Sequence, residues 1–175
     1  MDKHEIRRVV KERIGGCFDC DCASLWRTVE DMPQFRSAST VLMYWSLPDE
    51  VPTVDFIRKW SRFKKILLPV VNGDNLLLKE YSENALVKGY RGIMEPSLEA
   101  APASFQNVDF SIVPGVAFDR SCNRMGRGKG FYDRTLPHIS GFKAGVCFDF
   151  QLFDSIPVDP WDVPVDAVIT TKERI

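Results

Sequence analysis

The sequence has little histidine, no long apolar run and no excess of either charge. Lysine and arginine number 23 and aspartate and glutamate 24, which disfavours a nucleic-acid-binding surface because such surfaces carry a basic excess. No apolar run is long enough to cross a bilayer, and the opening residues, MDKHE, contain no apolar signal region. We therefore expect a cytoplasmic globular protein that binds neither nucleic acid nor a membrane, and a monomer by default.

The five cysteines leave one without a partner, and no secretion signal accompanies them, so reduced thiols are expected. The spacing of Cys17, Cys20 and Cys22 is similar to part of a metal cluster. A structural zinc site needs four ligands, however, and only the isolated Cys122 and Cys147 follow. Ordinary thiols in or beside a helix are the better interpretation, and a metal cluster is the weaker alternative.

One stretch, residues 123–133, concentrates glycine and positive charge in the sequence NRMGRGKGFYD. Its three glycines leave backbone N–H groups accessible, and Arg127 and Lys129 add full charges, with Arg124 close by. Such a loop suits anions, phosphates above all. Asp133 would repel a phosphate unless a divalent cation lay between them. The stretch therefore predicts a site for a nucleotide with Mg²⁺; the alternative is a glycine-rich surface turn with solvated charges.

This stretch is not a standard phosphate loop. In a Walker A motif Ser or Thr would follow the Gly-Lys pair, whereas Gly130 follows Lys129, and Asn123 stands where the first glycine would be. The dinucleotide-binding fingerprint also fails, because Phe131 occupies the place of its last glycine.

Apolar periodicity predicts one domain, residues 1–175, in which helices and strands alternate. Asp2 and Glu5 have capping-box spacing at the first helix, and Thr53 is a candidate N-cap. The segment 89–106 is expected to be a loop over one face of the sheet. The helices are expected at residues 3–14, 21–38 (one or two, broken near Pro33), 53–62 and 131–136, and the strands at 40–45, 65–71, 76–81, 108–113, 143–148 and 167–171. This alternation predicts an α/β fold with a largely parallel central sheet flanked by helices, a three-layer, Rossmann-like arrangement.

Taken together, the sequence resembles the 5-formyltetrahydrofolate cyclo-ligase family, also called the methenyltetrahydrofolate synthetases. Residues 114–119, PGVAFD, and 123–133 are similar to its signature of Pro-Gly, Phe-Asp and Arg-Leu-Gly-x-Gly-x-Gly-Tyr-Tyr-Asp. Met125 and Phe131 depart mildly from that signature. Weaker matches cover nearly the whole chain in the family's order: Lys3 with Arg7, Ser46 to Thr53, Gly92 to Pro96 and Val163 to Asp166.

The resemblance implies an ATP-dependent closure of 5-formyltetrahydrofolate to 5,10-methenyltetrahydrofolate with release of ADP and phosphate. ATP would phosphorylate the formyl oxygen, N10 would attack the formyl carbon, and phosphate would leave. No protein nucleophile is needed, so catalysis would consist of positioning and charge neutralisation.

The same resemblance implies a role for each matching residue. Arg127 and Lys129 would lie beside the reacting phosphoryl group as the catalytic cations, and Asp133 and Asp166 would hold Mg²⁺. The implied ATP-binding residues are Lys3, Arg7, Arg124, Met125, Gly126, Arg127, Gly128, Lys129, Gly130, Phe131 and Tyr132. The implied folate-binding residues are Trp45, Glu50, Arg127, Gly128, Lys129, Gly130 and Phe131. Without the resemblance, Trp45 would be an ordinary core aromatic and Glu50 a solvated loop residue.

Two other functions fit parts of the pattern. A different phosphate-dependent enzyme on a similar scaffold, such as a sugar-phosphate isomerase or a kinase, would also use the glycine loop. It would not need Trp45, Glu50 and the Lys3/Arg7 pair together. A non-catalytic folate- or nucleotide-binding relative would be expected to have lost a metal carboxylate or a loop cation, and none is missing.

Overall fold

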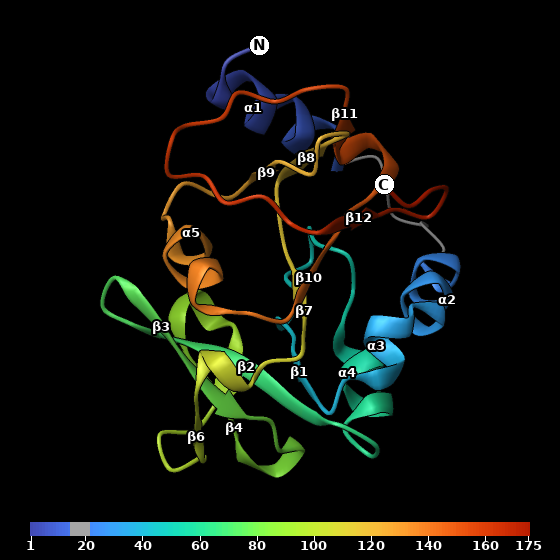
Figure 1. Ribbon diagram of the computed structural model, residues 1–175. Coiled ribbons are helices and arrows are strands. Elements are labelled where there is room, and N and C mark those ends of the chain that lie inside the picture. Colours follow the sequence, from blue (N-terminus) through green and yellow to red (C-terminus); the bar gives the residue numbers. More distant parts are fainter. Residues whose placement is uncertain (15–21) are drawn as a thin grey trace.

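A seven-stranded sheet organises the computed structural model, which describes residues 1–14 and 22–175 (Figure 1). The α-helices are α1 (Lys3–Ile14), α2 (Ala23–Asp31), α3 (Pro33–Ser37), α4 (Val54–Trp60) and α5 (Phe131–Thr135). The strands of the main sheet are β1 (Thr40–Leu42), β2 (Lys65–Asn72), β3 (Asn75–Glu80), β6 (Pro102–Ala103), β7 (Phe110–Val113), β10 (Phe142–Val146) and β12 (Ala167–Ile169). Smaller sheets contain β4 (Leu86–Lys88), β5 (Met94–Pro96), β8 (Ala117–Asp119), β9 (Arg124–Met125) and β11 (Leu152–Phe153).

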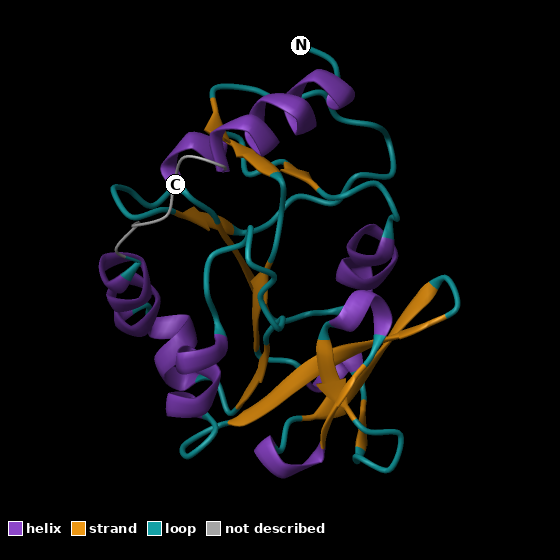
Figure 2. Ribbon diagram, turned by 180° about the vertical axis from the view of Figure 1, so that it is seen from behind, coloured by secondary structure: helices purple, strands orange, loops and turns teal. Residues whose placement is uncertain are grey.

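The strand order of the main sheet is β12-β10-β7-β1-β2-β3-β6. The first five strands are parallel, and β3 and β6 add an antiparallel edge. These pairings confirm the predicted α/β fold with a largely parallel sheet. Helices and turns cover both faces of the sheet (Figure 2). Beside it, β8 pairs with β11 and β9 in a three-stranded sheet next to α1, and β4 pairs with β5.

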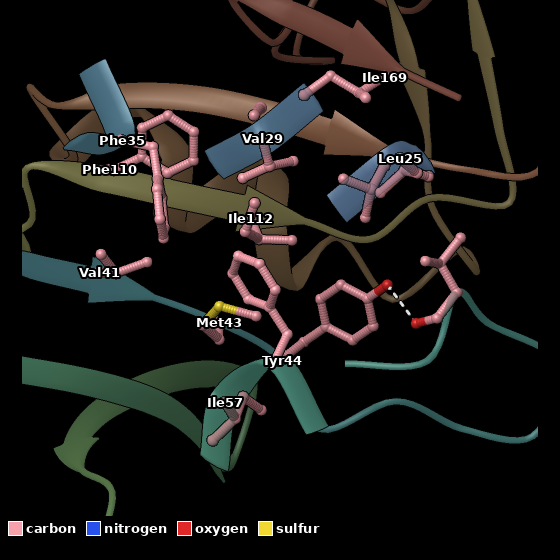
Figure 3. Packing of buried hydrophobic residues seen from close by; sticks show 14 of the residues in the cluster. Leu25, Val29, Phe35, Val41, Met43, Tyr44, Ile57, Phe110, Ile112 and Ile169 are labelled. Atoms are coloured by element: carbon pink, nitrogen blue, oxygen red, sulfur yellow. Dashed lines mark hydrogen bonds between the residues drawn. The ribbon is translucent and has the colours of Figure 1, made fainter. Parts of the chain in front are cut away.

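The core follows from the alternation of side chains along each strand. Val41 and Met43 point to the face that α2, α3 and α4 cover, where Phe35 packs edge-on against Phe110 (Figure 3). Leu42, between them, points to the opposite face and packs in a second cluster with residues after α5. Both faces are therefore buried, as a mainly parallel sheet requires.

The start of α1 has the predicted capping box. Asp2 Oδ1 accepts hydrogen bonds from the backbone N–H groups of His4 and Glu5, at 2.7 and 2.8 Å, and Glu5 Oε2 accepts from Asp2 N at 2.8 Å. Asp2 and Glu5 thereby satisfy N–H groups that a helix start leaves open.

Two local predictions are wrong. Residues 89–106 contain β5 and β6, and β6 joins the edge of the main sheet, so the segment is not only a loop. These strands of two or three residues are too short to give a periodic signal. Thr53 makes no side-chain cap to α4; its Oγ1 instead donates to Tyr44 O at 2.7 Å and accepts from Ser46 N at 3.1 Å.

The described residues contain no group of three or more His, Cys, Asp or Glu side chains that could hold a metal ion by themselves. Cys17 and Cys20 lie outside the described residues, and Cys22 is a buried thiol before α2. No helix in the described part of the chain is long and apolar enough to span a bilayer.

Candidate functional site

A cavity lies where β1 and β7 end, at the carboxyl edge of the parallel strands. This is the edge at which open α/β sheets bind ligands. Its walls combine four parts of the chain. They are Tyr44, Trp45, Leu47 and Glu50; Leu68, Pro69, Val71 and Leu76; Tyr90, Ile93, Met94 and Glu95; and Pro114, Gly115, Val116, Arg124, Gly126, Arg127, Lys129, Gly130, Phe131, Tyr132 and Asp133.

The glycine loop, residues 126–130, takes a backbone path that needs glycine. Gly128 and Gly130 have φ values of +96° and +68°, in the region that side chains with a Cβ rarely adopt. A Cβ on Gly126 would lie 3.0 Å from Arg124 Nη1. Glycine is therefore favoured at Gly128 and Gly130 by the backbone angle and at Gly126 by the close approach of Arg124, so the loop is not a generic flexible turn.

Arg124 is buried beneath this loop, with only 3% of its side chain exposed. Its Nη2 donates to Asp133 Oδ1 at 2.8 Å and its Nη1 to Pro114 O at 3.2 Å. The guanidinium also lies 5.4 Å from the ring centre of Tyr132. Nε is buried without a partner in the described structure. Arg124 thus joins the end of β7 to α5 and supports the loop from below.

The two cations of α1 have different surroundings. Arg7 donates from Nε and Nη2 to Gly126 O, both at 3.1 Å, so the structure brings it to the glycine loop. Lys3 instead forms ion pairs with Asp159, at 2.7 Å, and Asp162. Burial lowers the pKa of Lys3, but the hydrogen bonds to these two carboxylates outweigh it and hold the pKa above its ordinary value.

The two cations of the glycine loop also differ. Arg127 Nη1 and Nη2 donate to both oxygens of Asp49, at 3.0 and 2.7 Å, and Arg127 also contacts Glu50. Burial lowers the pKa of Arg127, but its bonds to these two carboxylates outweigh that effect and hold the pKa above its ordinary value, so the side chain stays charged. Lys129 lines the cavity, and its ammonium makes no ion pair or hydrogen bond with any residue in the described ranges. Lys129 is therefore the cation that is open to an incoming anion.

The 46–53 loop presents Glu50 and is closed by short-range hydrogen bonds. Ser46 and Thr53 bond to each other twice, each backbone N–H donating to the other's hydroxyl at 3.1 Å. Tyr44 Oη donates to Val51 O at 3.0 Å, the dashed line in Figure 3. Glu50 Oε2 accepts from the backbone N–H near the start of the loop, at 2.9 Å. The carboxylate of Glu50 is thus fixed at the cavity wall.

Aromatic side chains form the rest of the predicted folate site. Trp45 lines the cavity and packs against Tyr81, with ring centres 6.4 Å apart. Phe131 meets Tyr90 edge-on at 6.3 Å. The structure therefore brings Trp45, Glu50 and Phe131 to one cavity with the glycine loop.

The structure does not bring Asp166 to this cavity. Asp166 immediately precedes β12, where its Oδ2 accepts from Lys143 N at 2.7 Å, and it is absent from the cavity walls. Asp162, four residues earlier, forms an ion pair with Lys3 and accepts from Asp159 N at 2.8 Å, and it is also absent from the cavity walls. The sequence reasoning did not single out Asp162 or Asp49, which pair with Lys3 and Arg127, since nothing in the local pattern distinguishes them from solvated loop residues.

Residues 3–171 match the family model described as the 5-formyltetrahydrofolate cyclo-ligase family. The chain belongs to this family. It is 35% identical over 150 residues to the 5-formyltetrahydrofolate cyclo-ligase of Escherichia coli K12, covering 81% of this chain and 82% of that protein. A probable 5-formyltetrahydrofolate cyclo-ligase of Schizosaccharomyces pombe is 26% identical over 100% of this chain and 98% of its own.

Among solved structures, the NMR structure of Aquifex aeolicus 5,10-methenyltetrahydrofolate synthetase superposes with a TM-score of 0.87 and 34% identity. The match covers 99% of this chain and 92% of that one. The cyclo-ligase resemblance inferred from the glycine stretch is thereby confirmed, and so is the cyclo-ligase fold over nearly the whole chain.

Proposed function

We propose that this cyclo-ligase converts 5-formyltetrahydrofolate to 5,10-methenyltetrahydrofolate, using ATP with Mg²⁺ and releasing ADP and phosphate. The observation that supports this most is that one cavity is lined both by the glycine loop and by Trp45 and Glu50. A phosphate site and a site for a flat, N–H-bearing ring system therefore meet, as a transfer between two substrates requires.

The chemistry explains why a nucleotide is needed. The oxygen of a formamide is a poor leaving group, so ring closure must first activate it. Transfer of the terminal phosphoryl group of ATP to the formyl oxygen gives an iminium phosphate; N10 then attacks the formyl carbon and phosphate leaves. The protein supplies no nucleophile in this scheme. It holds the formyl oxygen in line with the phosphoryl group and neutralises charge.

Lys129 and Arg7 supply the positive charge at the phosphate end of the cavity. Lys129 is free to contact the transferred phosphoryl group, and Arg7 already reaches the carbonyl of Gly126. Accessible N–H groups of the glycine loop complete a cradle for phosphate oxygens. A contact that forms with the developing charge is worth roughly 3–4 kcal/mol in the transition state.

Asp133 is the carboxylate that we place on Mg²⁺; Asp166, the second carboxylate that the resemblance implies, lies outside the cavity walls. The residues fit this ion, because Mg²⁺ binds through one or two carboxylates together with substrate phosphates and needs no all-protein cage. Asp133 lines the cavity, where it is paired with Arg124. When bound, Mg²⁺ would neutralise phosphate oxygens held between Asp133 and the glycine loop.

Glu50 and Trp45 suit the pterin. The edge of a pterin carries N–H donors, and a fixed carboxylate accepts them, while an indole ring covers a flat face. Glu50 is held at the cavity wall with 14% of its side chain exposed, so its contact with a ligand would be largely shielded from water.

The direct test adds ATP to purified protein with 5-formyltetrahydrofolate and Mg²⁺ and follows the near-ultraviolet absorbance of the methenyl product. We expect a rise that stops when ATP is omitted or when a chelator removes Mg²⁺. A rise without ATP would contradict the proposal, and so would ATP binding without any product.

A further inference from the structure

The guanidinium of Arg127 is committed to carboxylates of the 46–53 loop. Besides its two bonds to Asp49, Nη2 and Nε lie 3.1 and 3.3 Å from Glu50 Oε1. A guanidinium has five N–H donors, and these four contacts use four of them. The other oxygen of Glu50 accepts from Leu47 N at 2.9 Å. Oε1 of Glu50 is therefore saturated by Arg127, and Oε2 already accepts one hydrogen bond from the protein.

This arrangement conflicts with the roles of both residues. Glu50 cannot accept the N–H groups of a pterin through Oε1 while Arg127 occupies that oxygen. Arg127 cannot give two parallel N–H groups to a phosphate while Asp49 accepts them. Each residue is available to its own substrate only after the contact between them has changed.

The contact between Arg127 and Asp49 is also exposed and weak enough for a ligand to replace it. Side-chain exposures are 38% for Arg127 and 40% for Asp49, so water and ligands reach the pair. An ion pair at such an exposed position is typically worth no more than about 1 kcal/mol. Phosphate accepts the same two-pronged guanidinium contact as a carboxylate, with more charge. A triphosphate in the glycine loop would therefore compete well with Asp49 for Arg127.

We propose that Arg127 couples the two substrate sites, with Asp49 as the residue that positions it in the nucleotide-free protein. In that state Arg127 occupies Glu50. The phosphates of a bound nucleotide draw Arg127 away, and Glu50 becomes free to accept the N–H groups of the pterin. Nucleotide binding therefore strengthens folate binding, and by linkage the reverse holds by the same factor. This inference rests on the proposed function of the cavity.

The experiment measures the dissociation constant of 5-formyltetrahydrofolate by tryptophan fluorescence and by calorimetry, with and without a non-hydrolysable ATP analogue and Mg²⁺. For the unmodified protein we expect the analogue to tighten folate binding at least about fivefold, at the lower end of typical couplings. For Arg127→Gln, folate binding without the analogue should already be tight, and the analogue should change it less than about twofold.

Two further variants sharpen the result. Asp49→Asn weakens the hold on Arg127, so the analogue should bind at least about threefold tighter in the absence of folate, a gain that lost structure would not produce. Arg120→Gln is the matched control, because Arg120 pairs with Asp154 and Glu173 and does not line the cavity. It should keep the full coupling.

The proposal is overturned if the analogue leaves folate affinity unchanged in the unmodified protein. It is equally overturned if Arg127→Gln binds folate more weakly without nucleotide, since Arg127 would then hold folate and not block Glu50. A measurement of turnover distinguishes failure of this inference from failure of the proposed function. Uncoupled binding in a protein that still forms the methenyl product refutes only this inference, whereas absence of both binding and product refutes the proposed function.

Discussion

Arg124 and Asp133 form an ion pair beneath the glycine loop, with Arg124 Nη2 2.8 Å from Asp133 Oδ1 and their side chains 3% and 18% exposed. Arg124 begins the short strand β9 before the loop, and Asp133 lies in the helix α5 after it. The pair therefore closes the base of the loop, and it places a carboxylate at the cavity wall that we assign to Mg²⁺.

Asp133→Asn should destabilise the fold as well as abolish turnover, because it leaves the charge of Arg124 buried without a counter-ion. We expect the free energy of unfolding in urea to fall by about 3 kcal/mol. The double variant Arg124→Met/Asp133→Leu removes both charges and should recover part of that loss while staying inactive. If Asp133→Asn is as stable as the unmodified protein, the pair does not support the loop.

Arg7→Met should raise KM for ATP about tenfold, since it removes two hydrogen bonds to Gly126 and a charge beside the phosphates. Arg8→Met is the matched control on the same helix. Within residues 1–14 and 22–175, Arg8 forms one ion pair, with Glu12, and both side chains are 62% exposed. Steady-state kinetics in ATP compares the two variants. Equal effects would show that loss of any positive charge from α1 raises KM for ATP, and the role assigned to Arg7 would have to be abandoned.

Lys129→Ala should lower kcat by a factor of about 10²–10³ and leave the melting temperature unchanged, because the side chain is exposed and makes no contact that stabilises the fold. Lys172→Ala, which removes another exposed lysine away from the cavity, should behave like the unmodified protein. An active Lys129→Ala enzyme would remove the assigned role from this residue.

Glu50→Ala should raise KM for 5-formyltetrahydrofolate at least about tenfold and change KM for ATP less than about threefold, since a buried hydrogen-bonding carboxylate is lost from one substrate only. Initial rates measured against each substrate separate the two effects. Equal losses for both substrates would place Glu50 outside the pterin site.

The ion pair between Lys3 and Asp162 makes stability depend on pH. Burial raises the pKa of Asp162, but the hydrogen bond from Lys3, a backbone N–H and nearby positive charge lower it more, so it lies below the ordinary 3.8. A carboxyl whose pKa falls on folding stabilises the protein above its ordinary pKa and loses this contribution as pH falls through the folded value. Because Lys3 has a raised pKa, its own contribution lasts up to about pH 10.5 and then declines.

Asp162→Asn should therefore lower the free energy of unfolding by about 2 kcal/mol at pH 7, and the difference should shrink progressively as pH falls below 3.8 and Asp162 becomes protonated in both states. Urea denaturation of both proteins across this range checks the prediction. A difference that is the same at every pH would mean that the charge of Asp162 does not stabilise the fold.

Much of the fold could be predicted because the parallel strands are buried on both faces and α1 carries its own capping box. The glycine stretch was also informative, since the positive φ values at Gly128 and Gly130 are ones that other residues rarely adopt. Strands of two or three residues, such as β6 and β9, were missed because they depend on their neighbours and carry no periodicity of their own.

The partners of charged residues could not be predicted, because they come from distant parts of the chain. Arg127 lies 78 residues from Asp49, and Lys3 lies 159 residues from Asp162. The position of Asp166 outside the cavity walls has the same origin, because it depends on how the folded chain turns the segment before β12.

The most direct test of the central claim follows the formyl oxygen itself. 5-Formyltetrahydrofolate labelled with ¹⁸O in the formyl group is converted with ATP and Mg²⁺, and the released phosphate is analysed by mass spectrometry. If the formyl oxygen is phosphorylated before N10 attacks, each phosphate carries the label. If the label appears in water and the phosphate is unlabelled, phosphoryl transfer to the formyl oxygen does not occur and the mechanism proposed for this cavity is wrong.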